Sequence, residues 1–150
     1  MIRRVHLLDI EDILLEPGTE ALSKFDCRFF KDWMKERNGI YLMTAHGLKD
    51  TRKKVTEEVL RLFDGYFVSS GRAYYEGDKK KNLRTVASKS GVIEVLAESL
   101  SIDPSELVVY CKREEKMTNP VYKKAMKMGA CVRLVRSRNE TFDFIMSNYS

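Results

Sequence analysis

Short apolar runs alternate with amphipathic stretches along the whole chain, and this alternation constrains the fold more than any other feature. Runs of this length and apolar composition are typical of buried strands. The predicted strands are Val5–Leu8, Ile40–Met43, Tyr66–Val68, Leu107–Tyr110 and Cys131–Val135. Strands that alternate with helices form mainly parallel sheets covered by helices on both faces. The sequence therefore predicts a three-layer α/β fold around a sheet of five strands.

Apolar residues recur at helical spacing between these strands. The spacing predicts helices over 19–37, from about 50 to 63, over 88–100 and over 121–128. In the first of these helices, Phe25, Phe29 and Phe30 are expected to face the core. Gly39 and Gly129 follow the ends of two predicted helices, where glycine is the usual stop signal.

The composition favours one globular domain that covers residues 1–150. The chain is 43% hydrophobic and has 3 prolines and 8 glycines, which argues against disordered and collagen-like proteins. No apolar run approaches the roughly 20 residues of a membrane span, and no secretory signal pattern is present, so we expect a cytoplasmic protein without a membrane partner. Three dispersed cysteines and two histidines argue against a zinc site. The net charge of +5 is compatible with a phosphate-rich partner.

Polar side chains follow the predicted strands at their carboxyl ends, where the working groups of parallel sheets gather. Asp9 and Glu11 follow the first strand, and carboxylates at positions i and i+2 leave the same side of an extended chain. Such a pair can hold Mg²⁺ through oxygen. Thr44 ends the second strand, and Glu115 lies beyond the fourth. Lys89, at the start of a helix, can neutralise charge that develops on a phosphoryl group.

At these residues the sequence resembles the haloacid dehalogenase-like (HAD) phosphohydrolase superfamily. The first motif of that family is an apolar strand followed by D-x-D, which corresponds here to Leu7–Glu11. The second is an apolar strand that ends in Thr or Ser, here Tyr41–Thr44. The third is a lysine at a helix, here Lys89, and the fourth is a strand followed by G-D-x-x-x-D, here Val108–Glu115. The resemblance runs from residue 5 to about residue 135.

The resemblance implies a Rossmann-like HAD fold without a cap domain, and an aspartyl-phosphate mechanism. Asp9 is then the nucleophile, and Glu11 is the general acid and base. Thr44 and Lys89 hold the phosphoryl group. Mg²⁺ is the expected cofactor, bound by Asp9, Glu11 and Glu115. The expected reaction is the hydrolysis of a phosphomonoester on a nucleotide or polynucleotide end.

The sequence also departs from the family pattern. Glu11 replaces the second aspartate of D-x-D, and the two residues at positions 12–13, Asp and Ile, replace the usual Gly-Thr. Cys111 stands where a metal-binding aspartate is expected, and thiol sulfur is a poor ligand for a hard cation. Lys112 and Arg113 add positive charge at the same place. The alternative function is therefore a catalytically eroded HAD-fold protein, a pseudoenzyme that binds nucleic acid or a protein partner.

A basic segment over 72–84 precedes Lys89, as in the 3′-phosphatase domain of phage polynucleotide kinases, which the chain resembles most within the superfamily. The segment interleaves tyrosines with cations, a combination that can stack bases while it holds phosphates. The candidate nucleic-acid-binding residues are Arg72, Tyr74, Tyr75, Lys79, Lys80, Lys81 and Arg84. The same run is also typical of a solvated surface.

Overall fold

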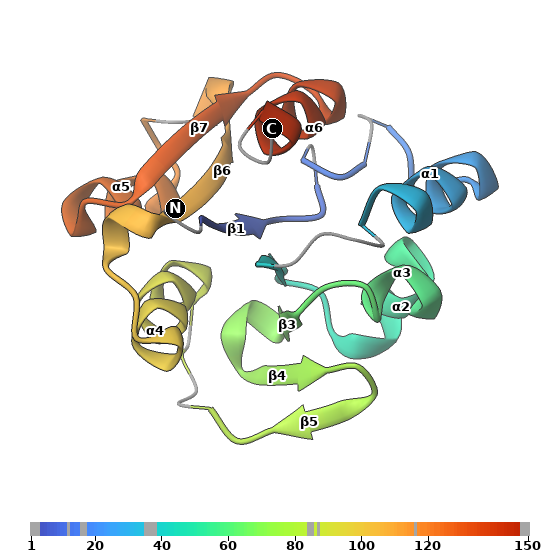
Figure 1. Cartoon of the computed structure of the whole chain (residues 1–150), viewed down its shortest axis with the longest axis horizontal. Coiled ribbons are helices and arrows are strands. Elements are labelled where there is room, and N and C mark those ends of the chain that lie inside the picture. Colours follow the sequence, from blue (N-terminus) through green and yellow to red (C-terminus); the bar gives the residue numbers. More distant parts are fainter. Residues whose placement is uncertain are drawn as a thin grey trace.

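The computed structural model describes residues 4–11, 13–15, 18–34, 39–83, 86, 88–115 and 117–147. The strands that it describes form one sheet in the order β5-β4-β3-β2-β1-β6-β7 (Figure 1). Their bounds are β1 Val5–Leu8, β2 Ile40–Met43, β3 Gly65–Val68, β4 Ala73–Glu76, β5 Lys79–Lys81, β6 Leu107–Lys112 and β7 Cys131–Val135. The five predicted strands are all present and pair in parallel, so the predicted mainly parallel sheet is confirmed.

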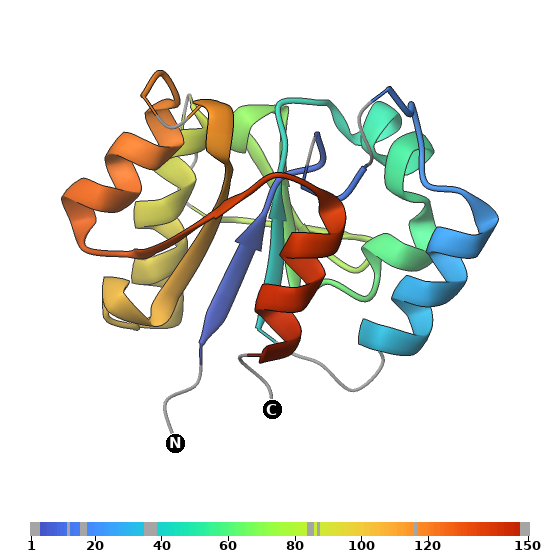
Figure 2. The same cartoon turned by 90° about the horizontal axis from the view of Figure 1, so that it is seen from above.

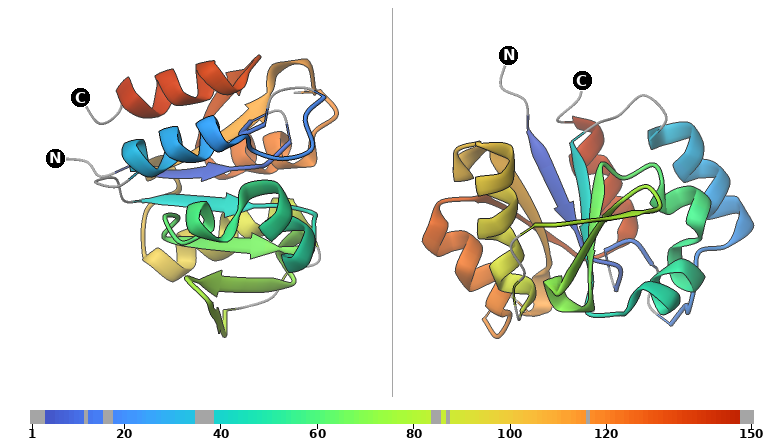
Figure 3. Two further views of the ribbon diagram at one scale, coloured as in Figure 1. Left: turned by 90° about the vertical axis from the view of Figure 1, so that its right-hand side faces the viewer. Right: turned by 90° about the horizontal axis from the view of Figure 1, so that it is seen from below.

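Two strands were not predicted. β4 and β5 form an antiparallel hairpin that joins the sheet beside β3 and makes one of its edges (Figure 3). With this hairpin the sheet has two strands more than the predicted five or so. Its residues did not read as strands because β5 consists of three exposed lysines, and lysine is depleted in strands.

The helices cover both faces of the sheet, as expected (Figure 2). Their bounds are α1 Lys24–Met34, α2 Leu48–Val55, α3 Glu57–Leu60, α4 Lys89–Leu100, α5 Pro120–Met128 and α6 Arg138–Ser147. Side chains of α1, α2, α3 and α6 pack with Leu8 and Leu42 on one face. Side chains of α4 and α5 pack with Leu7 and Val109 on the other face. Leu7 and Leu8 point to opposite faces because successive side chains of a strand alternate.

The helices differ from the prediction in three places. α1 begins at Lys24 rather than at residue 19. The second predicted helix is two helices, because Thr56 has a φ of 75° and ends α2, and its side chain accepts a hydrogen bond from the Val59 backbone N–H to cap α3. α6 was not predicted. None of the described helices is long and apolar enough to cross a membrane.

The phenylalanines of α1 do not all face the core. Phe30 is 1% exposed, but Phe25 is 76% exposed and Phe29 is 39% exposed. The expectation that all three are buried is therefore wrong for Phe25 and Phe29. The ring of Phe29 instead packs at the rim of the core, 5.4 Å from the ring of Phe142 in α6.

Candidate functional site

A cavity of about 520 Å³ opens where the carboxyl ends of the central parallel strands meet the first turns of α4 and α5. Four of the predicted site residues line it, and they come from segments far apart in the sequence. These residues are Asp9, Glu11, Lys89 and Glu115. The parallel pairing of β1 with β2 and β6 places the ends of these strands at one edge, which explains why the segments meet.

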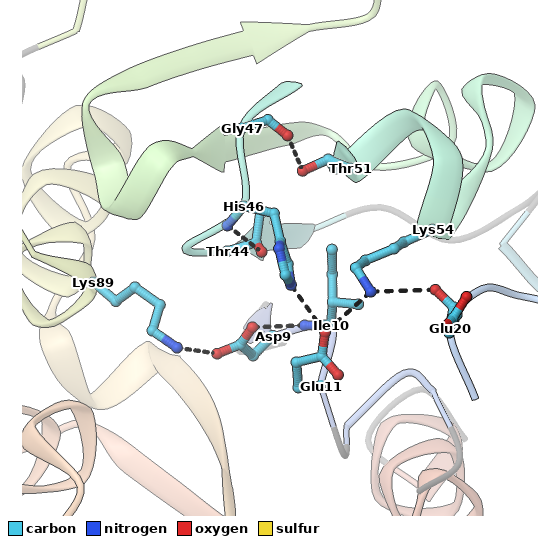
Figure 4. Close-up of polar contacts among 10 residues, drawn as sticks. All are labelled: Asp9, Ile10, Glu11, Glu20, Thr44, His46, Gly47, Thr51, Lys54 and Lys89. Atoms are coloured by element: carbon cyan, nitrogen blue, oxygen red, sulfur yellow. Dashed lines mark hydrogen bonds and ion pairs between the residues drawn. The ribbon is translucent and has the colours of Figure 1, made fainter. Parts of the chain in front are cut away.

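Asp9 and Lys89 form an ion pair in this cavity (Figure 4). The Lys89 Nζ donates to Asp9 Oδ2 at 2.6 Å, and the Ile10 backbone N–H donates to Asp9 Oδ1 at 2.7 Å. The Asp9 side chain is 17% exposed, whereas that of Lys89 is 33% exposed. Lys89 is the first residue of α4, so the helix fixes the origin of its long side chain. The Asp9 carboxylate is therefore oriented through both oxygens.

Glu11 is held by a different set of partners on the opposite side of Asp9 from Lys89 (Figure 4). Its Oε1 lies 2.9 Å from His46 Nε2 and 3.6 Å from Lys54 Nζ. Lys54 also donates to the Glu20 carbonyl at 3.3 Å. The sequence did not identify His46 or Lys54 as neighbours of Glu11. The only signal for His46 was its position two residues after Thr44.

Thr44 lies at the carboxyl end of β2 but is not among the residues that line the cavity. It is 1% exposed, and its hydroxyl oxygen accepts a hydrogen bond of 3.1 Å from the His46 backbone N–H. Its carbonyl accepts from the Ser70 backbone N–H, and Ser70 does line the cavity. Thr44 therefore holds together the two loops that follow β2 and β3. Its predicted contact with a phosphoryl group stays a prediction.

The end of β6 brings a thiol and an ammonium group to the cavity. Cys111 is buried, and its burial, together with the negative charge of Asp9, raises the pKa of the thiol to about 12. The side chain is therefore neutral at physiological pH. Lys112, the next residue, also lines the cavity, and its Nζ lies 4.0 Å from the Glu114 carboxylate. Glu115 is exposed at the mouth.

These residues do not fit a resident Mg²⁺ ion. Within the part of the chain that the structure describes, no three or more His, Cys, Asp or Glu side chains are grouped so that they could hold a metal ion. Asp9 and Glu11 face the cationic groups of Lys89 and Lys54, which compete with a metal for the carboxylate oxygens. Cys111 adds a neutral thiol where a hard cation needs oxygen.

The predicted nucleic-acid-binding residues that the structure describes lie on the β4–β5 hairpin, except Arg72, which lies just before it. Arg72 and the three lysines of β5 are exposed, and Arg84 lies outside the described residues. Tyr74 is buried, with its ring 4.5 Å from that of Phe67, so the expectation that it stacks on bases is wrong. Tyr75 is half-buried and already stacks on Tyr66, with ring centres 5.6 Å apart. The hairpin therefore presents cations rather than aromatic faces.

Solved structures with this fold include phosphatases of the HAD-like superfamily. An IMP-bound IMP-nucleotidase of Plasmodium falciparum is 8% identical, and the match covers 97% of this chain and 68% of the nucleotidase with a TM-score of 0.65. A protein of Thermoplasma acidophilum is 10% identical, with 99% of both chains covered and a TM-score of 0.64. The sucrose-phosphatase of Synechocystis, in complex with sucrose and phosphate, is 10% identical, with coverage of 96% of this chain and 87% of that one and a TM-score of 0.53.

No protein-family model matches the chain, and no curated protein matches it in sequence. Identities of this size establish a common fold and leave activity and substrate to be argued from the site. The predicted HAD-like fold is therefore confirmed: the chain has the mainly parallel, Rossmann-like architecture of these phosphatases.

Proposed function

We propose that this chain binds a phosphorylated ligand in the cavity at the carboxyl edge of its sheet. The observation that carries the proposal is that two lysines, Lys89 and Lys112, line one cavity together with the first turns of α4 and α5. Ammonium groups and helix N-termini are both favourable neighbours for a phosphate. Matches to an IMP-bound nucleotidase and to a phosphatase that holds phosphate agree with this chemistry.

The size of the cavity favours a phosphomonoester about as large as a nucleotide. A volume of about 520 Å³ falls inside the roughly 300–1,000 Å³ of most small-molecule sites. When the phosphoryl group enters, Lys89 exchanges part of its hydrogen bonding from Asp9 to a phosphoryl oxygen. The hydroxyls of Ser70, Ser88 and Ser90, which also line the cavity, are further donors for the ligand.

Isothermal titration calorimetry with inorganic phosphate and with a nucleoside monophosphate tests this function. Lys89→Gln should weaken binding by about tenfold or more, because a charge-assisted hydrogen bond is lost. The matched control is Lys124→Gln. Like that of Lys89, the Lys124 side chain is 33% exposed and is paired with a carboxylate, here that of Glu94 at 3.5 Å. Lys124 is not among the residues that line the cavity. Equal affinities of the two variants would contradict the proposal.

Hydrolysis of the bound phosphomonoester is a second candidate function, which the orientation of the Asp9 carboxylate favours. One Asp9 oxygen would form a bond to phosphorus as the ester oxygen leaves, and that oxygen would take a proton from the Glu11–His46 pair. Water would then cleave the acyl phosphate and regenerate Asp9. The test is phosphate release and the detection of phosphorylated Asp9 by mass spectrometry, with Asp9→Asn as the inactive control. Release that survives in this variant would exclude Asp9 as the nucleophile.

A polynucleotide end is the ligand class that the basic hairpin favours. The three lysines of β5 are all exposed, so they can contact the phosphates of a polynucleotide whose end lies elsewhere on the protein. A protein with an acidic surface is the other partner that these lysines suit. Binding that weakens steeply as salt rises, and that occurs with oligonucleotides of unrelated sequence, would favour the polynucleotide.

A further inference from the structure

The end of β6 places a lysine beside the acidic end of β1. The two strands pair in parallel with Leu7 opposite Val109, and this register continued by two residues sets Asp9 opposite Cys111. Side chains alternate along β6, so Lys112 starts on the other face of the sheet from Cys111. At the end of the strand, however, both Asp9 and Lys112 line the cavity. The Lys112 side chain is 28% exposed, so it lies partly in the protein rather than fully in solvent.

Among the residues that the structure describes, two carboxylates at the cavity already face lysines. Within the described part of the chain, the carboxylates that line the cavity belong to Asp9, Glu11 and Glu115. Lys89 pairs with Asp9, and Lys54 lies beside Glu11. Lys112 is also in the lining, with its Nζ 4.0 Å from the carboxylate of Glu114. Divalent-cation sites need several oxygen donors whose charge is not already compensated. A Mg²⁺ ion would have to displace lysines here, whereas a phosphoryl dianion finds two of them at the same cavity.

We propose that the ammonium groups of Lys112 and Lys89 together replace a divalent cation, so that this cavity binds a phosphoryl group without metal. This inference rests on the proposed phosphate-binding function and assigns to Lys112 a role that the sequence motifs give to a metal site. The phosphoryl oxygens lie between the two ammonium groups. Lys89 approaches from the first turn of α4, and Lys112 approaches from the end of β6.

The experiment measures the affinity of the full chain for inorganic phosphate by calorimetry, once with EDTA and once with Mg²⁺. The wild-type affinity should agree within about twofold in the two conditions, since no metal takes part. Lys112→Gln should weaken binding by about tenfold in EDTA, because one charge-assisted contact is removed. Lys112→Arg keeps the charge and should retain most of the affinity. Circular dichroism shows whether each variant is folded, and Lys124→Gln is the control for loss of a lysine elsewhere.

The outcomes separate this inference from the function on which it rests. Wild-type binding that requires Mg²⁺ would overturn the inference and leave phosphate binding intact. Unchanged affinity in folded Lys112→Gln would also overturn it. No phosphate binding in any condition would overturn the proposed function itself.

Discussion

His6 should make the stability of this protein fall as the pH is lowered. The side chain lies in β1, is 1% exposed, and has its Nδ1 2.9 Å from the Tyr110 hydroxyl. Burial lowers the pKa of His6 from 6.5 to about 4, and the positive charges of Arg4 and Arg133 act in the same direction. Between these two pKa values the unfolded chain binds more protons than the folded one. The free energy of unfolding therefore decreases as the pH falls from about 6.5 to about 4.

The size of this loss follows from the width of the interval. One pKa unit corresponds to about 1.4 kcal/mol, so the whole interval is worth about 3 kcal/mol, and about 2.5 kcal/mol of this is lost by pH 4.5. A loss of this size is a large fraction of the roughly 5–15 kcal/mol by which a domain is stable.

Urea unfolding of the wild type and of His6→Gln, each at about pH 7.5 and pH 4.5, measures the effect. The variant keeps every other titrating group, including His46, so these groups cancel in the comparison. The wild type should lose about 2.5 kcal/mol more than the variant over this range. An equal loss in both proteins would refute the reasoning. If His6→Gln does not fold, the ring resonances of His6 in the wild type give a second readout, because they should not titrate above about pH 5.

The remaining predictions concern backbone strain, thiol reactivity and polyanion binding. Gly71→Ala should lower the free energy of unfolding in urea by about 3 kcal/mol, because φ is +95° and the new Cβ would collide with Val86. Gly129→Ala, where φ is +80° but the space is open, should lower it by only about 1 kcal/mol. Equal costs would contradict the packing at Gly71. Iodoacetamide at about pH 8 should modify Cys111 last of the three cysteines, since its thiol has a pKa of about 12; mass spectrometry gives the order, and early modification of Cys111 would refute its burial. Changing Lys79, Lys80 and Lys81 together to Glu should abolish retention of the protein on heparin at low salt. The same change at the three lysines of α5 should not abolish it. Equal effects of the two changes would argue against a polyanion-binding surface on the hairpin.

The parallel part of the sheet was predictable because its strands are short apolar runs buried on both faces. The hairpin was not, since an exposed edge strand of lysines has no apolar pattern. α6 was missed because its apolar residues include the exposed Met146 as well as the buried Phe142 and Ile145, so they do not mark one face of a helix. Phe25 shows the opposite error, because helical spacing identifies apolar positions without showing which stripe meets the sheet.

The meeting of Asp9 with Lys89 was predictable in outline, since both lie where the ends of parallel strands and the starts of helices converge. The partners of Glu11 were not. They depend on how the loop after β2 and the last turn of α2 pack beside β1, which no local pattern encodes. The local sequence also did not indicate that the Thr44 hydroxyl accepts a hydrogen bond from the His46 backbone N–H.

The central position of β1 has a consequence for how the chain folds. Val5 pairs with Leu107 of β6 on one side, and His6 pairs with Ile40 of β2 on the other. In sequence, β6 is therefore much farther from β1 than β2 is. Closing so long a loop is slow, because its entropic cost precedes any gain from the contacts. During synthesis the side of β1 that receives β6 therefore stays unpaired and prone to aggregation until residues 107–112 have emerged from the ribosome.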